Sequence, residues 1–371
     1  MVDLLRDRLL TMTRAGSAVD VLQNINPDRG GLVLVGKGAS ERLRPLRGSP
    51  GADVLAIDPE RHTGQWATPE DPFGLADGDG RLTPGPTLTQ VLKSQLASGA
   101  SFAVTPTGFI PDRDVPTLDA VVDHAAEAEV ANTLVVLPCG FDWLREPHIH
   151  ALVSAAGRSR YPVGLALAGD AKPDPLDHSG VPAQMRRLCQ TCDRLVIWRT
   201  DLAALDAIAH GALAGAVGTN ATLRHAMRPM PERKGFGRRL FPALIVERLL
   251  RFVRQNTIRD WYAAGRDAWT CDCTACDGRR LTDIPDGAAG ERATLGHNCR
   301  VLGALHCGLA EHREGEDRLE WWHSRIDEAW AAHRRLAVEV GGDQNLQVPR
   351  VLTAWRRDPP PPLSGAWSTA P

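Results

Sequence analysis

The sequence predicts an α/β fold: a (β/α)8 barrel of the TIM type, followed by a smaller helical subdomain at the C-terminal end. Three observations support it. Short apolar runs recur from residue 31 onward, and helix-like segments separate most of them. The pattern changes after Arg228, and a dense group of cysteines follows at 271–276. Finally, 371 residues exceed what one small core needs and suit a large barrel with an appendage.

Seven short apolar runs are predicted to be strands of the barrel. Most are aliphatic or β-branched without polar alternation, which is typical of strands that are buried on both faces of a parallel sheet. Their ranges are 32–36, 54–58, 102–107, 133–139, 163–169, 194–200 and 214–220.

Amphipathic segments between the later runs are predicted to be the connecting helices. They cover 88–99, 115–129, 146–157, 181–192 and 201–213. Strands and helices that alternate over this length favour a closed barrel over an open doubly wound sheet. The eighth strand is expected either before residue 31, in the AVDVLQNI segment, or after residue 228.

The remainder of the chain is predicted to be mainly helical. Helical periodicity is found at 243–265, 291–312 and 317–340. We therefore expect the barrel in residues 1–240, a helical and metal-binding subdomain in 241–345, and a proline-rich, poorly ordered tail in 346–371.

Composition excludes some classes of protein. The net charge of −2 argues against an overall cationic surface for nucleic acid, so any contact with a polyanion must be local. No apolar run reaches the roughly 18 residues of a membrane span. The start, MVDLLRDRLL, lacks the apolar core of a secretory signal. We expect a cytoplasmic protein with no membrane partner, in which cysteines are metal ligands, core residues or reactive thiols rather than disulfides.

The segment CDCTACDG predicts a zinc site. Cys271, Cys273 and Cys276 form a CxCxxC pattern that brings three thiols to one ion from a tight turn. A structural zinc ion takes four ligands in a closed tetrahedron. The best fourth ligand is His297, 21 positions after Cys276 at the start of a helical pattern, and the competitors are His306, Cys299 and Cys307.

These features together resemble the tRNA-guanine transglycosylase family, the queuine and archaeosine tRNA-ribosyltransferases. CxCxxC, a gap of about twenty residues and a His-Asn dipeptide on a helix all follow a predicted β/α barrel. The resemblance covers roughly residues 50–310. It implies a barrel with a zinc-binding subdomain near the C-terminus, and an enzyme that exchanges a guanine-type base in a nucleic acid.

Several strand ends match positions of that family. VLAIDPERHTGQ places Asp58 at the position of the active-site acid. FAVTPTGFIPD resembles the strand of the base-reading aspartate, VVLPCG stands where the family has a Val-Gln-Gly-Gly element, and PVGLALAGD resembles its glycine-rich strand. The resemblance and the strand-end positions together predict these substrate-binding candidates: Thr105, Thr107, Cys139, Gly169, Asp170, Arg199, Arg224 and Arg228.

One departure affects the chemistry. The family's nucleophilic aspartate aligns with Asn220, and an amide cannot form the covalent glycosyl intermediate that a carboxylate forms. Asp58 paired with Asp170 or Asp201 could instead supply the carboxylate and the acid/base of a glycosyl transfer. Asp201 has a second interpretation as the N-cap of the helix that follows it.

The basic residues beyond Asn220 also have two interpretations. Arg224, His225 and Arg228 begin a basic stretch that continues through residues 233–239, which would either follow a phosphate backbone or form a solvated loop. We expect a transglycosylase-like protein, with Asp58, Asp201 and Asn220 at the catalytic positions. It would act on a guanine or 7-deazaguanine-type base in tRNA or DNA, alone or as a homo- or hetero-oligomer. The alternatives are a catalytically silent nucleic-acid-binding or partner subunit and a barrel that acts on a small nucleoside.

Overall fold

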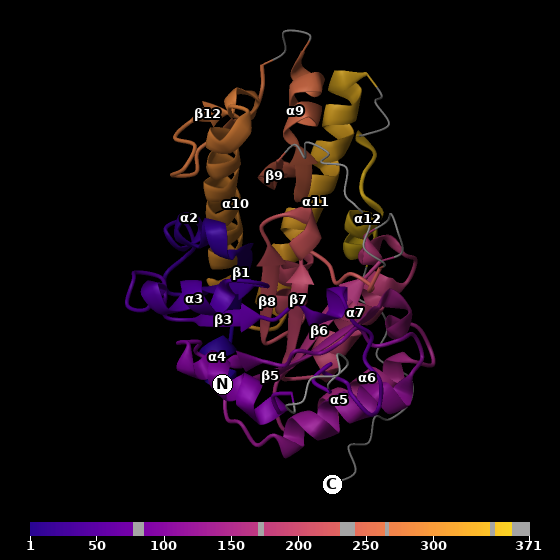
Figure 1. Ribbon diagram of the computed structural model, residues 1–371. Helices are drawn as coiled ribbons and strands as arrows, with labels where there is room; N and C mark the ends of the chain where they lie inside the picture. Colours follow the sequence, from indigo (N-terminus) through magenta and orange to yellow (C-terminus); the bar gives the residue numbers. More distant parts are fainter. Residues whose placement is uncertain (77–84, 170–173, 231–241, 264–266, 342–345, 358–371) are drawn as a thin grey trace.

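The computed structural model describes residues 1–76, 85–169, 174–230, 242–263, 267–341 and 346–357. Eight parallel strands form the barrel predicted from the sequence, and the C-terminal elements stand against one side of it (Figure 1). The strands are β1 Arg8–Arg14, β2 Gly30–Val35, β3 Leu55–Asp58, β4 Ala103–Val104, β5 Thr133–Gly140, β6 Val163–Ala168, β7 Leu195–Thr200 and β8 Ala214–Gly218.

The order of the strands is that of a closing barrel. The hydrogen-bonded order is β3-β2-β1-β8-β7-β6-β5-β4, so β1 lies between β2 and β8. The two outer strands approach each other at Ser101, whose amide donates to the Leu55 carbonyl oxygen at 2.7 Å. The predicted fold class is therefore confirmed.

The eighth strand is β1. It lies before residue 31, but the AVDVLQNI segment in which it was expected begins instead as helix α2, and residues after 228 do not supply it. The sequence RLLTMTR alternates leucine and methionine with threonine, and its five central residues are all buried. β1 pairs with β2 over Leu9–Arg14 and with β8 over Arg8–Met12.

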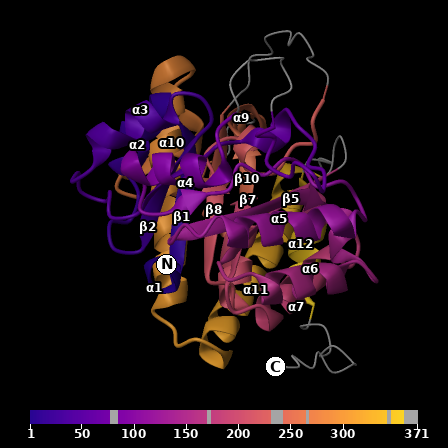
Figure 2. The ribbon, with the colours of Figure 1, turned by 60° about the horizontal axis from the view of Figure 1, so that its bottom comes forward.

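Helices cover the outside of the barrel, as Figure 2 shows from a second direction. They are α2 Ala18–Leu22, α3 Ala39–Leu43, α4 Leu88–Ala97, α5 Val115–Glu127, α6 Ile149–Arg158, α7 Val181–Thr191 and α8 Ala203–Ala209. The short helix α1 Val2–Leu5 instead packs against the core inside the barrel. Short 3-10 helices are η1 Ala15–Ser17, η2 Arg44–Leu46, η3 Arg61–Thr63, η4 Phe141–Leu144, η5 Pro175–Asp177, η6 Ala221–Leu223, η7 Glu247–Leu249 and η8 Leu281–Asp283.

Strand side chains alternate between two cores. Val33 and Val35 of β2 point into the barrel, where they join Met12 and Phe102. Leu32 and Leu34 of the same strand pack outward against the neighbouring helices. This period of two explains the uninterrupted apolar runs, because both faces of each strand are buried. The interior is thus filled with side chains, which leaves the strand ends as the place for a site.

The C-terminal subdomain contains strands as well as helices. Its elements are β9 Ala243–Val246, β10 Arg251–Arg254, α9 Gln255–Tyr262, β11 Thr270–Cys271, β12 Arg279–Arg280, α10 Gly287–Ala310, α11 Glu316–Val340 and α12 Arg350–Arg356. α10 packs on α2 and β9, and α12 packs on α7 and α11. Residues 350–356 of the predicted tail form α12, and residues 358–371 lie outside the described residues.

The helix predicted for 243–265 is wrong in its first half. β9 and β10 form an antiparallel pair there, joined through η7 and a left-handed Leu250 at φ 44°. Tertiary contacts override the helical pattern, because Asn298 of α10 accepts a hydrogen bond from the Ile245 amide and donates one to the Ala243 carbonyl oxygen. Among the described helices, none is long and apolar enough to cross a membrane.

Candidate functional site

Three cysteines and one histidine come together in the C-terminal subdomain, as the sequence predicts. The Sγ atoms of Cys271, Cys273 and Cys276 lie 3.4, 3.7 and 3.3 Å from Nδ1 of His297. The cysteines come from the β11–β12 turn and the histidine from α10. The competing residues His306, Cys299 and Cys307 are not part of this group. The four side chains could hold one metal ion.

The ring of His297 is oriented for this role by the strand beside it. Its Nε2 donates to the Ile245 carbonyl oxygen at 2.9 Å, so Nδ1 is left as the acceptor that faces the thiols. Hydrogen bonds from Cys271 and Cys276 lower the pKa of the Cys273 thiol, which favours a thiolate. An outer hydrogen bond to a carbonyl is the usual way in which a metal-binding histidine is fixed.

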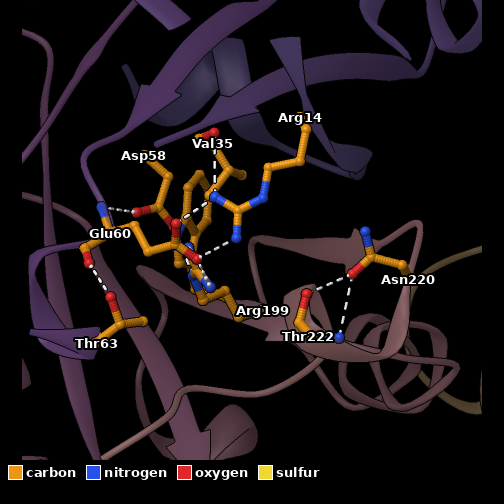
Figure 3. A network of polar contacts seen from close by, with 9 residues as sticks. Arg14, Val35, Asp58, Glu60, Thr63, Arg199, Asn220 and Thr222 are labelled. Carbon is orange, nitrogen blue, oxygen red and sulfur yellow. Dashed lines mark hydrogen bonds and ion pairs between the residues drawn. The ribbon is translucent and has the colours of Figure 1, made fainter. Parts of the chain in front are cut away.

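A second group of polar residues closes the mouth of the barrel. Asp58, at the end of β3, is 4% exposed and accepts hydrogen bonds from Trp198 Nε1 at 2.9 Å and Arg199 Nε at 2.8 Å. Three strands separate β3 from β7 in the sheet, so Trp198 and Arg199 reach Asp58 across the barrel. Figure 3 shows Glu60 and Arg14 beside them: Glu60 binds both arginines.

A distortion of β7 allows two successive side chains to reach the same carboxylate. Neighbouring residues of a regular strand point to opposite faces. Here the register shifts between Ile197 and Thr200, and Arg199 has a φ of 52°. Bulges of this kind re-aim side chains and are frequent near active sites. Arg199, predicted to bind substrate, instead binds Asp58 and Glu60.

The charges around Asp58 determine its protonation. Burial alone would raise its pKa, but Arg199, His62 and the hydrogen bonds from Arg199 and Trp198 outweigh burial and hold the pKa below its usual value. His62 is 3% exposed, and burial together with the Arg199 charge lowers its pKa to about 3. Asp58 is therefore a carboxylate, and His62 is neutral at neutral pH.

Asn220 lies apart from this group. Its Oδ1 accepts hydrogen bonds from the amide and hydroxyl of Thr222, at 3.1 and 2.7 Å, and it caps η6 (Figure 3). It is exposed at the C-terminal end of β8, where a strand-end site is expected.

Several predicted substrate-binding residues are in the barrel wall. Thr105 and Thr107 are each 2% exposed and hydrogen-bond to each other at 2.8 Å. The Thr105 hydroxyl also accepts a hydrogen bond from the Val136 amide of β5, in the place of a backbone carbonyl oxygen of the neighbouring strand. Cys139 is buried at the end of β5, and burial raises the pKa of its thiol. These side chains support the barrel rather than face its opening. Gly169 follows β6, half-buried, and Asp170 lies outside the described residues.

The two predicted arginines beyond β8 have partners within the chain. Arg228 pairs with Asp112 at 2.8 Å. Arg224 is 8% exposed, stacks over Phe252 at 3.4 Å, and burial lowers its pKa to about 10. The basic positions in 231–241 lie outside the described residues. The described part of this stretch is thus integrated into the fold.

Sequence reasoning named Asp201 and His225 separately, but it missed Asp174 and the group that the three residues form. Asp174, Asp201 and His225 follow β6, β7 and β8, and their ligand atoms all lie within 4.8 Å of one another. Burial and the nearby Asp201 raise the pKa of Asp174 well above its usual value. Asp201 Oδ1 accepts from the Ala203 amide at the start of α8, although the N-cap residue of that helix is Leu202. The available signal was the position of all three residues just beyond strand ends.

Comparisons with known proteins do not identify a family. No protein-family profile matches the sequence, and no curated protein is significantly similar. Solved structures that match weakly include the complete multifunctional pyruvate carboxylase of Rhizobium etli, at 13% identity and a TM-score of 0.33 over 93% of this chain. A second structure of that enzyme, with the allosteric activator acetyl coenzyme A, gives 13% identity and a TM-score of 0.31 over 93% of this chain. The chain spans 33% and 30% of those two chains.

Proposed function

We propose that this chain is a tRNA-guanine transglycosylase-like protein that acts on a guanine or 7-deazaguanine-type base in RNA or DNA. The observation that carries the proposal is the Cys3His group, held by α10 against β9 at the side of a (β/α)8 barrel. The motif spacing resembles that family, and the group follows the barrel in the chain as it does there. A cytoplasmic location fits, because thiols stay reduced there.

Zinc is the metal that these four residues fit best. Sulfur and nitrogen ligands at about 2.3 and 2.0 Å from a tetrahedral zinc ion lie about 3.5 Å from each other. The three distances between Sγ and His297 Nδ1 are 3.3–3.7 Å, so the side chains already have this arrangement. Four protein ligands leave no open position, which assigns the ion a structural role.

The chemistry would take place at the mouth of the barrel, away from zinc. Base exchange breaks one glycosidic bond and forms another, through a positively charged sugar. Asp58, kept ionised by Arg199, would stabilise that charge by its electrostatic field. Asp201 would exchange a proton with the leaving and incoming bases. Asn220 would contact the ligand by hydrogen bonds, because an amide cannot trap the sugar covalently.

The test is incorporation of a labelled base. The full chain, loaded with zinc, is incubated with labelled guanine or 7-deazaguanine and with bulk tRNA or DNA. We expect incorporation into one polymer, abolished in Asp58→Asn and Asp201→Asn. Asp114→Asn is the matched control, since Asp114 also caps a helix after a barrel strand. If folded, zinc-loaded protein incorporates neither base into either polymer, it is not a transglycosylase.

A catalytically silent, nucleic-acid-binding or partner subunit is the second candidate. It is favoured by two observations: Asn220 stands at the nucleophile position, and Asp58 is already neutralised by Arg199. Binding of tRNA or DNA without incorporation would support this candidate. Exchange on a free nucleoside, with no binding of either polymer, would instead support a barrel that acts on a small nucleoside.

A further inference from the structure

Three side chains of metal-binding type meet at the C-terminal face of the barrel. Asp174 follows β6, Asp201 follows β7 and His225 follows β8, which are consecutive strands of the sheet. His225 Nε2 is 3.7 Å from Asp174 Oδ2, and each pair of ligand atoms is within 4.8 Å. Donors bound to one ion at about 2.0–2.2 Å lie roughly 3–4 Å apart. Small side-chain rotations would therefore bring all three onto one ion.

Backbone amides orient both carboxylates. Asp174 Oδ1 accepts from the Leu176 amide at 2.8 Å, and Asp201 Oδ1 accepts from the Ala203 amide at 2.9 Å. The Oδ2 atom of each aspartate is therefore left to bind a ligand between the three side chains. Hydrogen bonds that fix the ligands in this way are the outer support typical of metal sites.

Among the described residues, the two carboxylates accept hydrogen bonds from backbone amides but have no positively charged partner closer than His225. His225 makes no hydrogen bond to any described residue, although its side chain is 27% exposed, and 3.7 Å to Asp174 is too long for one. Within the described ranges, no arginine or lysine forms an ion pair with Asp174 or Asp201. Arg224 is near, but its Nε donates to the Gly218 carbonyl oxygen and its guanidinium lies on Phe252. Two partly buried carboxylates at this separation repel each other unless a proton or a cation lies between them.

We propose that Asp174, Asp201 and His225 bind one divalent first-row transition-metal ion, at a site separate from the Cys3His group. Oxygen and imidazole ligands suit Mn²⁺, Fe²⁺, Co²⁺ or Zn²⁺, whereas three thiolates select zinc. Three protein ligands leave positions for water or substrate, as in catalytic metal sites. The positive charge of the nearby Arg224 repels a metal ion at this site, so we expect a moderate affinity for the ion. This site does not rest on the transglycosylase proposal, and it makes Asp201 a metal ligand in place of the proton exchange proposed for it above.

The test is a titration with Mn²⁺, which leaves zinc in the thiolate site. The full chain is loaded with one zinc ion per chain, which the thiolate site takes first, and free Mn²⁺ is followed by its electron paramagnetic resonance signal. We expect one bound Mn²⁺ per chain. Asp174→Asn and Asp201→Asn should each weaken binding by at least about tenfold, because even outer-support changes commonly cost that much. Asparagine caps helices as well as aspartate does, so both variants should fold.

Two controls make the result decisive. Asp114→Asn removes a helix-capping carboxylate elsewhere on the barrel and should leave the affinity unchanged. His225→Gln removes a ligand without touching a helix cap and should weaken binding like the aspartate variants. The proposal is overturned if folded protein binds no second ion, tested with Mn²⁺ and then Co²⁺, or if binding persists unchanged in all three ligand variants.

Discussion

Asp58 and Arg199 form a buried ion pair across the mouth of the barrel, with Arg199 Nε 2.8 Å from Asp58 Oδ2. The side chain of Asp58 is 6% exposed and that of Arg199 is 0% exposed. They come from β3 and β7, which three other strands separate in the sheet. The pair therefore ties two walls of the barrel together. It also fixes the charge of the carboxylate on which the proposed chemistry depends.

Removing either partner of this pair should destabilise the fold. Arg199→Met leaves the buried Asp58 carboxylate without its cation, which costs about 3–5 kcal/mol. Asp58→Leu should cost less, because Arg199 keeps its ion pair with Glu60. The double variant leaves neither charge unpaired and should be more stable than at least one of the single variants. Urea unfolding measures all three free energies. If the two single losses simply add in the double variant, the pair is not coupled as described.

Stability should fall as the solution is acidified, partly because of His62. Its pKa is about 3 in the folded chain and 6.5 as the ordinary value, so between these pH values the unfolded chain binds more protons. The free energy of unfolding then decreases as pH falls from 6.5 toward 3. His62→Gln should reduce this slope. Burial also lowers the pKa values of His306 and His333 to about 4. Part of the dependence of stability on pH should therefore remain in His62→Gln.

Asp58 contributes in a lower pH range. Its pKa is below 3.8 when folded, so its ion pair stabilises the chain above that value, and the contribution is lost as pH falls through the folded pKa. In Asp58→Asn, the loss of stability below pH 3.8 should be smaller than in the unaltered chain. Unfolding followed by fluorescence at pH 2–4 tests this, and an equal loss in both proteins would contradict the role of Asp58.

The sequence predicts the barrel and the Cys3His group because both depend on local patterns. Buried parallel strands leave uninterrupted apolar runs, and CxCxxC sets three ligands within one turn. β1 was missed as a strand because RDRLLTMTR mixes charges with leucine. β9 was taken for helix because the contact that holds it comes from Asn298, 53 residues further along the chain.

The mouth of the barrel was harder to predict because its contacts are long-range. Asp58 was identified by its position at a strand end, but its partners lie 140 and 141 residues away. Arg199 reaches Asp58 because of the bulge in β7, and no pattern of residue types predicts that bulge. Thr105 and Thr107 also stand near a strand end, but their hydroxyls complete backbone hydrogen bonding in the wall.

Loss of the metal from the Cys3His group should destabilise the C-terminal subdomain. Analysis of purified zinc-loaded protein by mass spectrometry should find the ion retained in Cys307→Ser and lost in Cys273→Ser. Cys307 is the matched control because it is a half-buried thiol on α10 outside the group. Thermal unfolding should begin earlier in Cys273→Ser and after chelation, since a structural zinc ion contributes directly to folding. Equal metal content in the two variants would rule out this ligand set.

Gly218, at the end of β8, should not tolerate a side chain. A Cβ atom there would lie 2.3 Å from the Leu223 carbonyl carbon and 2.6 Å from the Arg224 amide nitrogen. Because these are backbone atoms, Gly218→Ala must displace the turn, at a cost of about 1–3 kcal/mol. Gly157, exposed in α6, has no atom within 4 Å of such a Cβ. Gly157→Ala should therefore stabilise the chain by about 0.5–1 kcal/mol.

The same pair of variants separates stability from the arrangement of the strand-end residues. The turn after Gly218 carries Asn220, Arg224 and His225, so its displacement should weaken Mn²⁺ binding as well as lower the melting temperature. Gly157→Ala should change the melting temperature alone. If Gly218→Ala lowers stability but binds Mn²⁺ like the unaltered chain, His225 is not held in place by the close packing of this turn against β8.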